Sequence, residues 1–241
     1  MNRPIGLAQG LLAVATMAAM NASLATQPYF AVPPNPQYDG GTQASSQYVP
    51  NYFSVISAQG SRGGAVTCTN STIMGNVGSS GLAPSVVLTG CPVSGHVVAP
   101  ITATVIAQFH SQFDQLGNRQ CEHILTGTMA GVTLHPGVYC FRAAASLTGT
   151  ATLIGPATGT WIFLVNGDLT GNSFTVVMAA GGKPCNVAWE SSGTTTMNTS
   201  DVKGNFWSGQ GMTFTGGTLV GRAFSKKAVT LTNVAATGCG F

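Results

Sequence analysis

Short phrases recur at fixed intervals along this chain, and the recurrence limits the folds open to it. The tripeptide Leu-Thr-Gly begins at Leu125, Leu147 and Leu169, so the two intervals between the phrases are equal. Intervals of about 20 residues that carry one strand motif are typical of solenoids, in which each turn of chain stacks on the previous one. The sequence therefore predicts a β-solenoid in which the Leu-Thr-Gly phrases stack in register, one strand spacing of about 4.8 Å apart.

A second, shorter interval recurs in the C-terminal part of the chain. It separates Met197, Phe214 and Leu231, and it also separates Gly204 from Gly221. Beside these positions run segments rich in aromatic and β-branched residues, namely GVYCF, TWIFLV, CNVAWE, GNFWS and GRAFS. Such residues fit a pleated, half-buried sheet. We therefore expect strands and turns throughout the region after Cys121.

One segment has helical periodicity instead. Its apolar residues follow one another at steps of four, four, four and three, and they are Ile101, Val105, Phe109, Phe113 and Leu116. This spacing makes a single apolar stripe on an α-helix. Pro100 suits the first helical turn, and Gly117 suits a left-handed stop. We expect a helix over about 100–116 that covers one side of the sheet core.

The chain carries very little charge. Charged residues make up 6% of the sequence, against about a quarter in ordinary globular proteins. The net charge is +3, and Lys226-Lys227 is the only basic pair. Binding to a phosphate backbone needs clustered basic residues, so nucleic acid is excluded as a partner.

Residues 1–51 differ in composition from the remainder. Residues 1–25 have the pattern of a signal peptide, with Arg3 at the start, an apolar run over 7–20 and the small-x-small site Ser23-Leu24-Ala25. The apolar run is shorter than the roughly 20 residues of a membrane span and contains Gln9 and Gly10, which disfavours an anchor. Residues 26–51 form a Pro-, Gln- and Ser-rich leader, and residues 52–241 form the domain. We expect a secreted or extracytoplasmic mature chain without a membrane span.

Six cysteines in an exported chain indicate disulfides. Six cysteines allow 15 pairings, so the connectivity stays open. Three brackets are plausible along the chain: Cys68 with Cys91, Cys121 with Cys140, and Cys185 with Cys239. A metal site is disfavoured because there is no Cys-x-x-Cys and no second ligand pair at useful spacing.

Alternation along the predicted strands assigns threonine and asparagine to the outer surface. If the apolar members of each phrase point inward, their neighbours point outward. These outward residues are Thr126, Thr128, Thr148, Thr150, Thr170, Asn172, Thr196, Asn198, Thr213, Thr215, Thr230 and Thr232. They would form two files on one flat side, about 6.7 Å apart along a strand and about 4.8 Å apart between coils. The register stays open, because either Leu147 or Gly149 could align with Leu231.

Two interpretations of such a threonine surface compete. Threonine is a good strand residue, so the files could simply be a solvent-exposed edge. However, ordinary sheet surfaces intersperse Lys and Glu, whereas a charge-free array of hydroxyls and methyls can order its hydration water at its own spacing. Such a surface is suited to binding a repeating solid, either ice or a crystalline polysaccharide.

Enzymatic activity is disfavoured by the small number of acidic residues in the chain, which has six in all. A β-solenoid lyase or hydrolase needs paired carboxylates or a calcium-binding acid cluster with a basic residue. Asp168 and Glu190, separated by the same interval as the Leu-Thr-Gly phrases, are the best candidate pair, although turn corners are the simpler explanation for both. The four histidines are scattered, and no serine or cysteine lies in a nucleophile-elbow phrase. We expect no catalysis, no metal and no cofactor.

Several phrases together resemble the secreted ice-binding protein family of microbes. They include LTGTMAGVTLHPGVYCF, LTGTATLIGPATGTWIFLV, SFTVVMAAGGKPCNVAWE, GGTLVGRAFSKKAVTLTN and the closing ATGC, and the resemblance covers roughly residues 52–241. It implies a mainly β fold, a right-handed discontinuous β-solenoid of triangular cross-section with one long α-helix packed alongside. Some active faces of that family carry Thr-(Ala/Gly)-x-(Thr/Asn), which Thr215-Gly216-Gly217-Thr218 approaches, so Thr218 joins the candidate ice-binding residues.

The expected function is therefore adsorption of a monomeric, secreted protein to ice or ordered water through a flat threonine-rich face. The alternative is an adhesive or structural surface module that binds insoluble polysaccharide or cells. A β-solenoid enzyme that degrades polysaccharide is the third hypothesis.

Overall fold

The computed structural model describes residues 52–240. The predicted signal peptide, the 26–51 leader and Phe241 lie outside the described residues. The described chain forms 17 β-strands and one α-helix, together with short 3₁₀ turns. It is thus mainly β, as the sequence predicts, and its strands pair in parallel in three ladders, which we name A, B and C.

Ladder A contains the strands that carry most of the predicted threonine files. In spatial order it runs through the first parts of β10 (Ala145–Ile154), β12 (Leu169–Ala179), β14 (Thr195–Ser208) and β15 (Met212–Ser225), then β16 (Val229–Thr232), β2 (Val66–Thr69) and β5 (Val86–Thr89). Ladder B runs through β8 (Thr133–Leu134), the later parts of β10 and β12, the middle of β14 and β15, then β17 (Ala235–Thr237) and β3 (Thr72–Met74).

Ladder C contains the strands that complete each coil, before the chain enters ladder A of the next coil. It runs through β7 (His123–Ile124), β9 (Gly137–Phe141), β11 (Trp161–Val165) and β13 (Val187–Ser191), the last parts of β14 and β15, then β1 (Phe53–Ser57), β4 (Asn76–Ser79) and β6 (Val97–Val98). The long strands β14 and β15 pass through all three ladders, so one strand supplies a whole coil.

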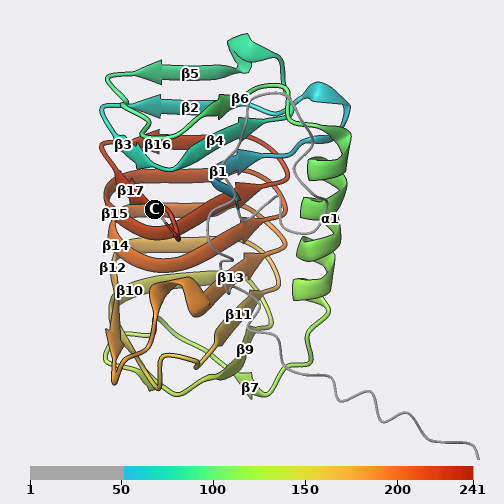
Figure 1. The fold of residues 1–241 in the computed structure, drawn as a ribbon. Helices are drawn as coiled ribbons and strands as arrows, with labels where there is room; N and C mark the ends of the chain where they lie inside the picture. Colours follow the sequence, from blue (N-terminus) through green and yellow to red (C-terminus); the bar gives the residue numbers. More distant parts are fainter. Residues whose placement is uncertain (1–51, 241) are drawn as a thin grey trace, which may run out of the picture.

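The coils do not stack in chain order. The C-terminal strands β15, β16 and β17 pair with the N-terminal strands β1, β2 and β3. Figure 1 shows β2 and β5 above β16 at one end of the stack and β7 at the other, with the helix α1 (Ala103–Gly117) alongside. At 1.5 Å per residue this helix spans about 22 Å, and it leads the chain from the N-terminal coils down to the opposite end.

The structure confirms the shorter sequence interval but not the Leu-Thr-Gly interval. Met197 pairs with Phe214 and Phe214 with Leu231, and Gly204 pairs with Gly221. The Leu-Thr-Gly phrases, in contrast, are out of register with one another. The coils that hold them are longer and unequal, because their turns contain extra residues such as the 3₁₀ turn η4 (Pro184–Asn186).

The three leucines that begin these phrases consequently occupy different positions in the ladders. Leu147 pairs with Gly171, whereas Leu169 pairs with Ala145. Leu125 follows β7 and donates its N–H to the Cys140 carbonyl, beside ladder C. Only Leu147 shares the inward column that continues through Met197 to Leu231, which answers the register question that the sequence left open.

Stacked aromatic rings fill the inside of ladder C. Phe163, Trp189 and Phe206 occupy equivalent positions in three successive coils. The Phe163 and Trp189 ring centroids are 3.9 Å apart, and those of Trp189 and Phe206 are 5.7 Å apart, with the rings nearly parallel. Because each such ring buries about 150–250 Å², these columns contribute much of the apolar burial of the core.

The helix covers the outer surface of ladder C. Its buried stripe packs against Ile162, Leu164, Trp207 and Phe224, and Phe109 stacks on Trp207 with 5.6 Å between ring centroids. The stripe predicted from the sequence is buried throughout, at Ile101, Val105, Phe109, Phe113 and Leu116.

The helix ends differ from the prediction. The helix begins at Ala103, and the Thr102 hydroxyl caps it by accepting from the Val105 N–H at 3.3 Å, so Pro100 precedes the helix rather than forming its first turn. Gly117 is the last helical residue but has no left-handed φ. Asn118 instead continues the helical pattern by donating its N–H to the Asp114 carbonyl.

Three disulfides join the predicted brackets. Cα–Cα distances are 5.9 Å for Cys68–Cys91 and for Cys121–Cys140, and 5.7 Å for Cys185–Cys239. The first ties β2 to the segment after β5 at one end of the stack, and the second ties the opposite end to β9. A terminal coil has a neighbour on one side only, so these two bonds restrain the parts of the solenoid with the fewest contacts.

Glu190 is a buried carboxyl group under the end of the helix. It lies in β13 opposite Trp207 and is 5% exposed, with Gly117 of α1 close to its carboxyl oxygens. Burial raises the pKa of Glu190 to about 7, with Lys226 opposing and Asp114 adding to this effect. Lys226 also forms an ion pair with Asp114, Nζ to Oδ1 3.2 Å.

In residues 52–240, no helix is both long and apolar enough to cross a membrane.

Replacing Gly221 by alanine should destabilise the stack. Gly221 has φ +153, and a Cβ there would overlap the Gly204 carbonyl oxygen of the neighbouring coil. We expect the free energy of unfolding to fall by more than about 1 kcal/mol, measured by chemical denaturation. Gly211→Ala is the control, because the nearest atom to its Cβ would be 3.8 Å away. Equal stabilities of the two variants would contradict this account of the close approach.

Glu190→Gln should remove a pH dependence of stability. The folded protein holds the Glu190 proton more tightly than the unfolded chain, whose pKa is near 4.5. The free energy of unfolding should therefore fall as the pH rises from about 4.5 to about 7. Above pH 7 the variant should be more stable than the unmodified protein by on the order of 2 kcal/mol. Asp201→Asn, at an exposed carboxyl, should keep the original slope, and the same slope in the Glu190→Gln variant would refute the assignment.

Candidate functional site

The outer surface of ladder A carries two files of small residues, all polar except Val87, which together we name the threonine face. The first file contains Ser146, Thr170, Thr196, Thr213, Thr230, Thr67 and Val87. The second file contains Asn172, Asn198, Thr215, Thr232, Thr69 and Thr89. The residues between the files, such as Met197, Phe214 and Leu231, point into the core and are buried.

In several coils, a residue with a left-handed backbone conformation follows the strand of the threonine face. Thr215 is followed by Gly216 with φ +69, Thr232 by Asn233 with φ +55, and Thr89 by Gly90 with φ +58. Gly and Asn adopt this conformation most readily because larger side chains clash with the backbone there. The corner turns the chain from ladder A to ladder B at the same place in these coils, which keeps the edge of the face straight.

The predicted residues separate into three groups. Eight lie on the threonine face, namely Thr170, Asn172, Thr196, Asn198, Thr213, Thr215, Thr230 and Thr232. Thr150 and Thr218 lie on ladder B, because Gly149, Gly216 and Gly217 turn the chain before them.

The other three residues lie in or beside the coil at the β7 end. Thr148 falls at a register shift at the corner, and its N–H donates to the Thr128 carbonyl at 3.1 Å. Thr126 and Thr128 belong to the connection between β7 and β8. The prediction that both files share one flat side is therefore wrong for Thr150, and Thr218 likewise lies on ladder B. Thr126, Thr128 and Thr148 have no strand partner in ladder A within residues 52–240, so their place on the flat side stays a prediction.

The N-terminal part of the face is not among the residues predicted from the sequence. Thr67, Thr69 and Thr89 extend the two files by two further coils, because β2 stacks on β16 and β5 on β2. The signal was present in the sequence: VTCTN at 66–70 matches VTLTN at 229–233. The segments are far apart in the chain, so no fixed interval connects them.

The threonine face is uncharged, and ladder B is not. Neither file of the face contains a charged residue. The outer surface of ladder B includes Asp201 and Lys203, and Thr218 donates to Asp201 with Oγ1 to Oδ1 2.8 Å. It also has large exposed apolar side chains in two coils, Met74 at 47% and Val177 at 40%, whereas the threonine face has one in its two files, Val87 at 48% in the β5 coil. Of these two surfaces, only the threonine face repeats one chemistry over successive coils.

The two acids considered for catalysis lie in different surroundings. Asp168 is exposed and accepts hydrogen bonds from Thr194, 2.7 Å from the backbone nitrogen and 2.9 Å from Oγ1, which lowers the pKa of Asp168. Glu190 lies in the middle of β13 under the helix, so the turn-corner explanation is wrong for it. Asp168 is thus engaged as a turn-stabilising acceptor, and Glu190 is buried beside Gly117 of the helix. Within residues 52–240 no group of three or more His, Cys, Asp or Glu side chains is arranged to hold a metal ion.

Relatives of known name match most of the chain. The ice-binding protein of Flavobacterium frigoris (strain PS1) is 29% identical over 191 residues, which cover 71% of this chain and 69% of that protein. The ice-binding protein of Nostoc sp. (strain HG1) is 30% identical over 190 residues, 73% of this chain and 70% of its own.

Solved structures of ice-binding proteins share the fold. The protein from the Antarctic ascomycete Antarctomyces psychrotrophicus superposes with a TM-score of 0.70 at 24% identity, over 78% of this chain and 95% of that one. An antifreeze ice-binding protein from an Arctic yeast superposes with a TM-score of 0.69 at 18% identity, over 81% and 94%. The model of the ice-binding-like family matches residues 60–237, and the chain therefore belongs to that family.

Proposed function

We propose that this chain is a secreted ice-binding protein that adsorbs to ice through the threonine face. The observation that carries the proposal is the charge-free pair of files, which stays in register over successive coils of ladder A. Membership of the ice-binding-like family supports the same function.

The geometry of the face suits a crystalline partner. Equivalent hydroxyls and methyls repeat about 4.8 Å apart between coils and about 6.7 Å apart along a strand. Hydroxyl groups hold bridging water, and methyl groups restrict the water between them. Because the coils are rigidly paired, the spacing is set before contact with ice, and little conformational entropy is lost on adsorption. This mode of action requires neither a cofactor nor catalysis.

Two further properties belong to the proposal. Secretion is supported by the three disulfides, which persist in oxidising compartments, and by the signal-like segment 1–25. We also propose that the three ladders enclose a triangular cross-section with right-handed winding, in line with the resemblance to ice-binding proteins. The chain is proposed to act as a monomer.

Thr215→Tyr should abolish most ice binding without unfolding the protein. Thr215 is exposed in the middle coils of the face, so a bulky ring there would hold neighbouring rungs away from the ice surface. We expect inhibition of ice recrystallisation to require at least about tenfold more protein, equivalent to about 1.4 kcal/mol. The melting temperature should be unchanged. Thr150→Tyr is the matched control, since Thr150 is an exposed threonine of ladder B.

The outcomes separate the candidate surfaces and functions. If Thr150→Tyr removes activity and Thr215→Tyr does not, the site lies on ladder B. If the unmodified protein neither shapes ice nor inhibits its recrystallisation at micromolar concentration, the ice-binding proposal fails. Co-sedimentation with insoluble polysaccharide then tests the adhesive alternative.

The N-terminal coil should contribute to the same surface. Thr67→Tyr should lower ice activity although Thr67 is far in sequence from the other members, because it stands beside Thr230 in the first file. Thr237→Tyr is the control, since Thr237 is a partly exposed threonine of ladder B paired with Met74 of β3. Full activity of the Thr67→Tyr variant in the recrystallisation assay would limit the site to the coils below β2.

A further inference from the structure

Two acceptor sequences for N-linked glycosylation lie in the described chain, Asn70-Ser71-Thr72 and Asn198-Thr199-Ser200. Asparagine in Asn-x-(Ser/Thr) accepts glycans in secreted proteins, usually at surface loops. We propose that Asn70 is an N-glycosylation site of this protein and that Asn198 is not. The inference rests on the secretion proposed above but does not depend on ice binding.

Asn198 is unsuited to carry a glycan. Its Nδ2 donates to Asn172 Oδ1 at 3.0 Å within the second file of the threonine face. Ser200 is 2% exposed, and its hydroxyl donates to the Asn198 carbonyl at 2.8 Å and accepts from the Phe174 N–H at 3.1 Å. A sugar on Asn198 would break the hydrogen bond to Asn172 and would lie among the side chains of closely paired strands.

Asn70 has the opposite surroundings. It is the left-handed corner residue after β2, with φ +47, and it is exposed. Within residues 52–240 its side-chain amide forms no hydrogen bond, and Thr72, the hydroxyl residue of the acceptor sequence, is exposed as well. On the next coil, a Cβ at Gly90 would lie 2.9 Å from Asn70 Oδ1. The absence of a side chain at Gly90 therefore leaves room for the Asn70 side chain.

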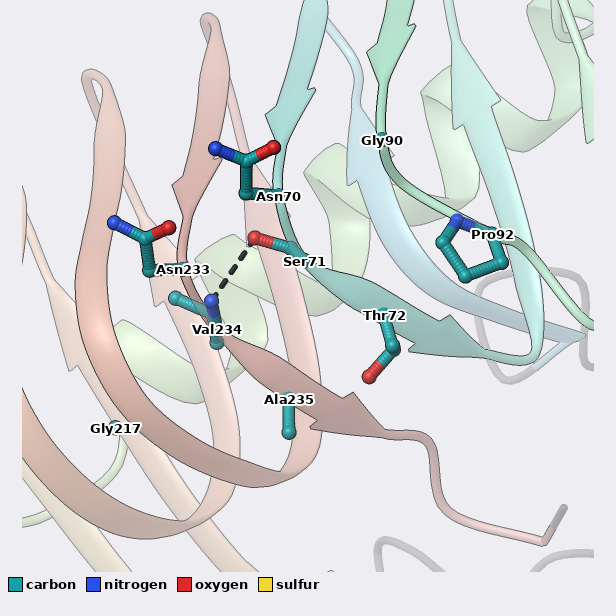
Figure 2. Close-up of a pocket in the computed structure, with 9 residues that line it drawn as sticks. All are labelled: Asn70, Ser71, Thr72, Gly90, Pro92, Gly217, Asn233, Val234 and Ala235. Atoms are coloured by element: carbon teal, nitrogen blue, oxygen red, sulfur yellow. Dashed lines mark hydrogen bonds between the residues drawn. The ribbon is translucent and has the colours of Figure 1, made fainter.

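A hollow beside Asn70 could seat the first sugar (Figure 2). It is bordered by Gly90 and Pro92 on one side and by Val234, Ala235 and Gly217 on the other. Asn70 and Asn233 point in the same direction from neighbouring coils, and the Ser71 hydroxyl accepts from the Val234 N–H at 2.9 Å, which joins the coils beneath the hollow. A pyranose ring has an apolar face that matches the exposed Pro92, and its hydroxyls and acetamido group match the exposed Asn233 amide.

The modification has a defined chemistry. The Asn70 Nδ2 attacks C1 of the first amino sugar of a lipid-pyrophosphate-linked oligosaccharide, and a C–N bond forms. The C1–O bond to the pyrophosphate breaks, the lipid pyrophosphate leaves with the electron pair, and the amide nitrogen loses one proton. No oxidant or reductant is needed.

The position has a structural consequence. Asn70 stands where ladders A and B meet, one coil below the end of the stack formed by β5. A glycan there would project beside β5, whose outer edge has no strand partner among residues 52–240. Exposed strand edges invite pairing with other chains, so the glycan would hinder end-to-end association.

The test is secretion of the full chain from a yeast host, with peptide mass spectrometry before and after an endoglycosidase that leaves one sugar on the asparagine. We expect one modified site, Asn70, in the unmodified protein and in the Asn198→Gln variant. Asn70→Gln and Thr72→Ala should lose the modification, and Thr72→Ser should keep it because serine preserves the acceptor sequence.

Secreted yield and circular dichroism of each variant establish that it is folded. An unmodified Asn70 in the folded, secreted chain overturns the proposal. A glycan on Asn198 overturns its second half. Because the readout is mass at a named peptide, failure here leaves the ice-binding proposal untouched, and absence of ice activity leaves the glycosylation result untouched.

Discussion

Parallel backbone pairing between coils of matching length is the constraint on which the rest of this structure depends. Strands β14 and β15 pair from one end to the other, beginning with Thr195 opposite Met212 and ending with Ser208 opposite Ser225. Strand β16 continues the pattern at the same sequence interval. Each corner must then fall at the same place in each of these coils, which explains the recurring left-handed residues beside ladder A. It also explains why Gly204 and Gly221 oppose one another, since their backbones approach too closely for a side chain.

The three ladders use the same backbone for different purposes. The outer side of ladder C is apolar apart from buried polar groups such as Glu190, and α1 covers it and buries Phe109 against Trp207. The outer side of ladder B mixes charge, hydroxyls and exposed aliphatic groups. The outer side of ladder A repeats small uncharged groups. The helix thus buries the outer side of ladder C, while the outer sides of ladders A and B remain exposed. Of these two exposed sides, that of ladder A has the more uniform chemistry.

The sequence predicts the fold class, the helix and the disulfide brackets because each depends on local pattern or simple spacing. The apolar stripe at Val105 and Phe109 needs only helical periodicity, and the pairing of Phe214 with Leu231 needs only an equal interval. Placement of Leu125 and Leu169 fails because turn insertions change the coil length while the tripeptide stays the same. Thr67 and Thr69 are missed for another reason: their neighbours in space are Thr230 and Thr232, and only topology brings the two ends of the chain together.

That topology has a consequence for how the molecule assembles. The Ser71 hydroxyl and the Val234 N–H, far apart in the chain, meet in adjacent coils. Contacts of such long sequence separation form slowly because a long loop must close first. The helix is part of the covalent connection between the N-terminal coils and the other end of the stack. Before β2 pairs with β16, this connection keeps β2 at a high effective concentration near the edge of β16. The connection favours closure within one molecule over exchange of the N-terminal coils between two molecules.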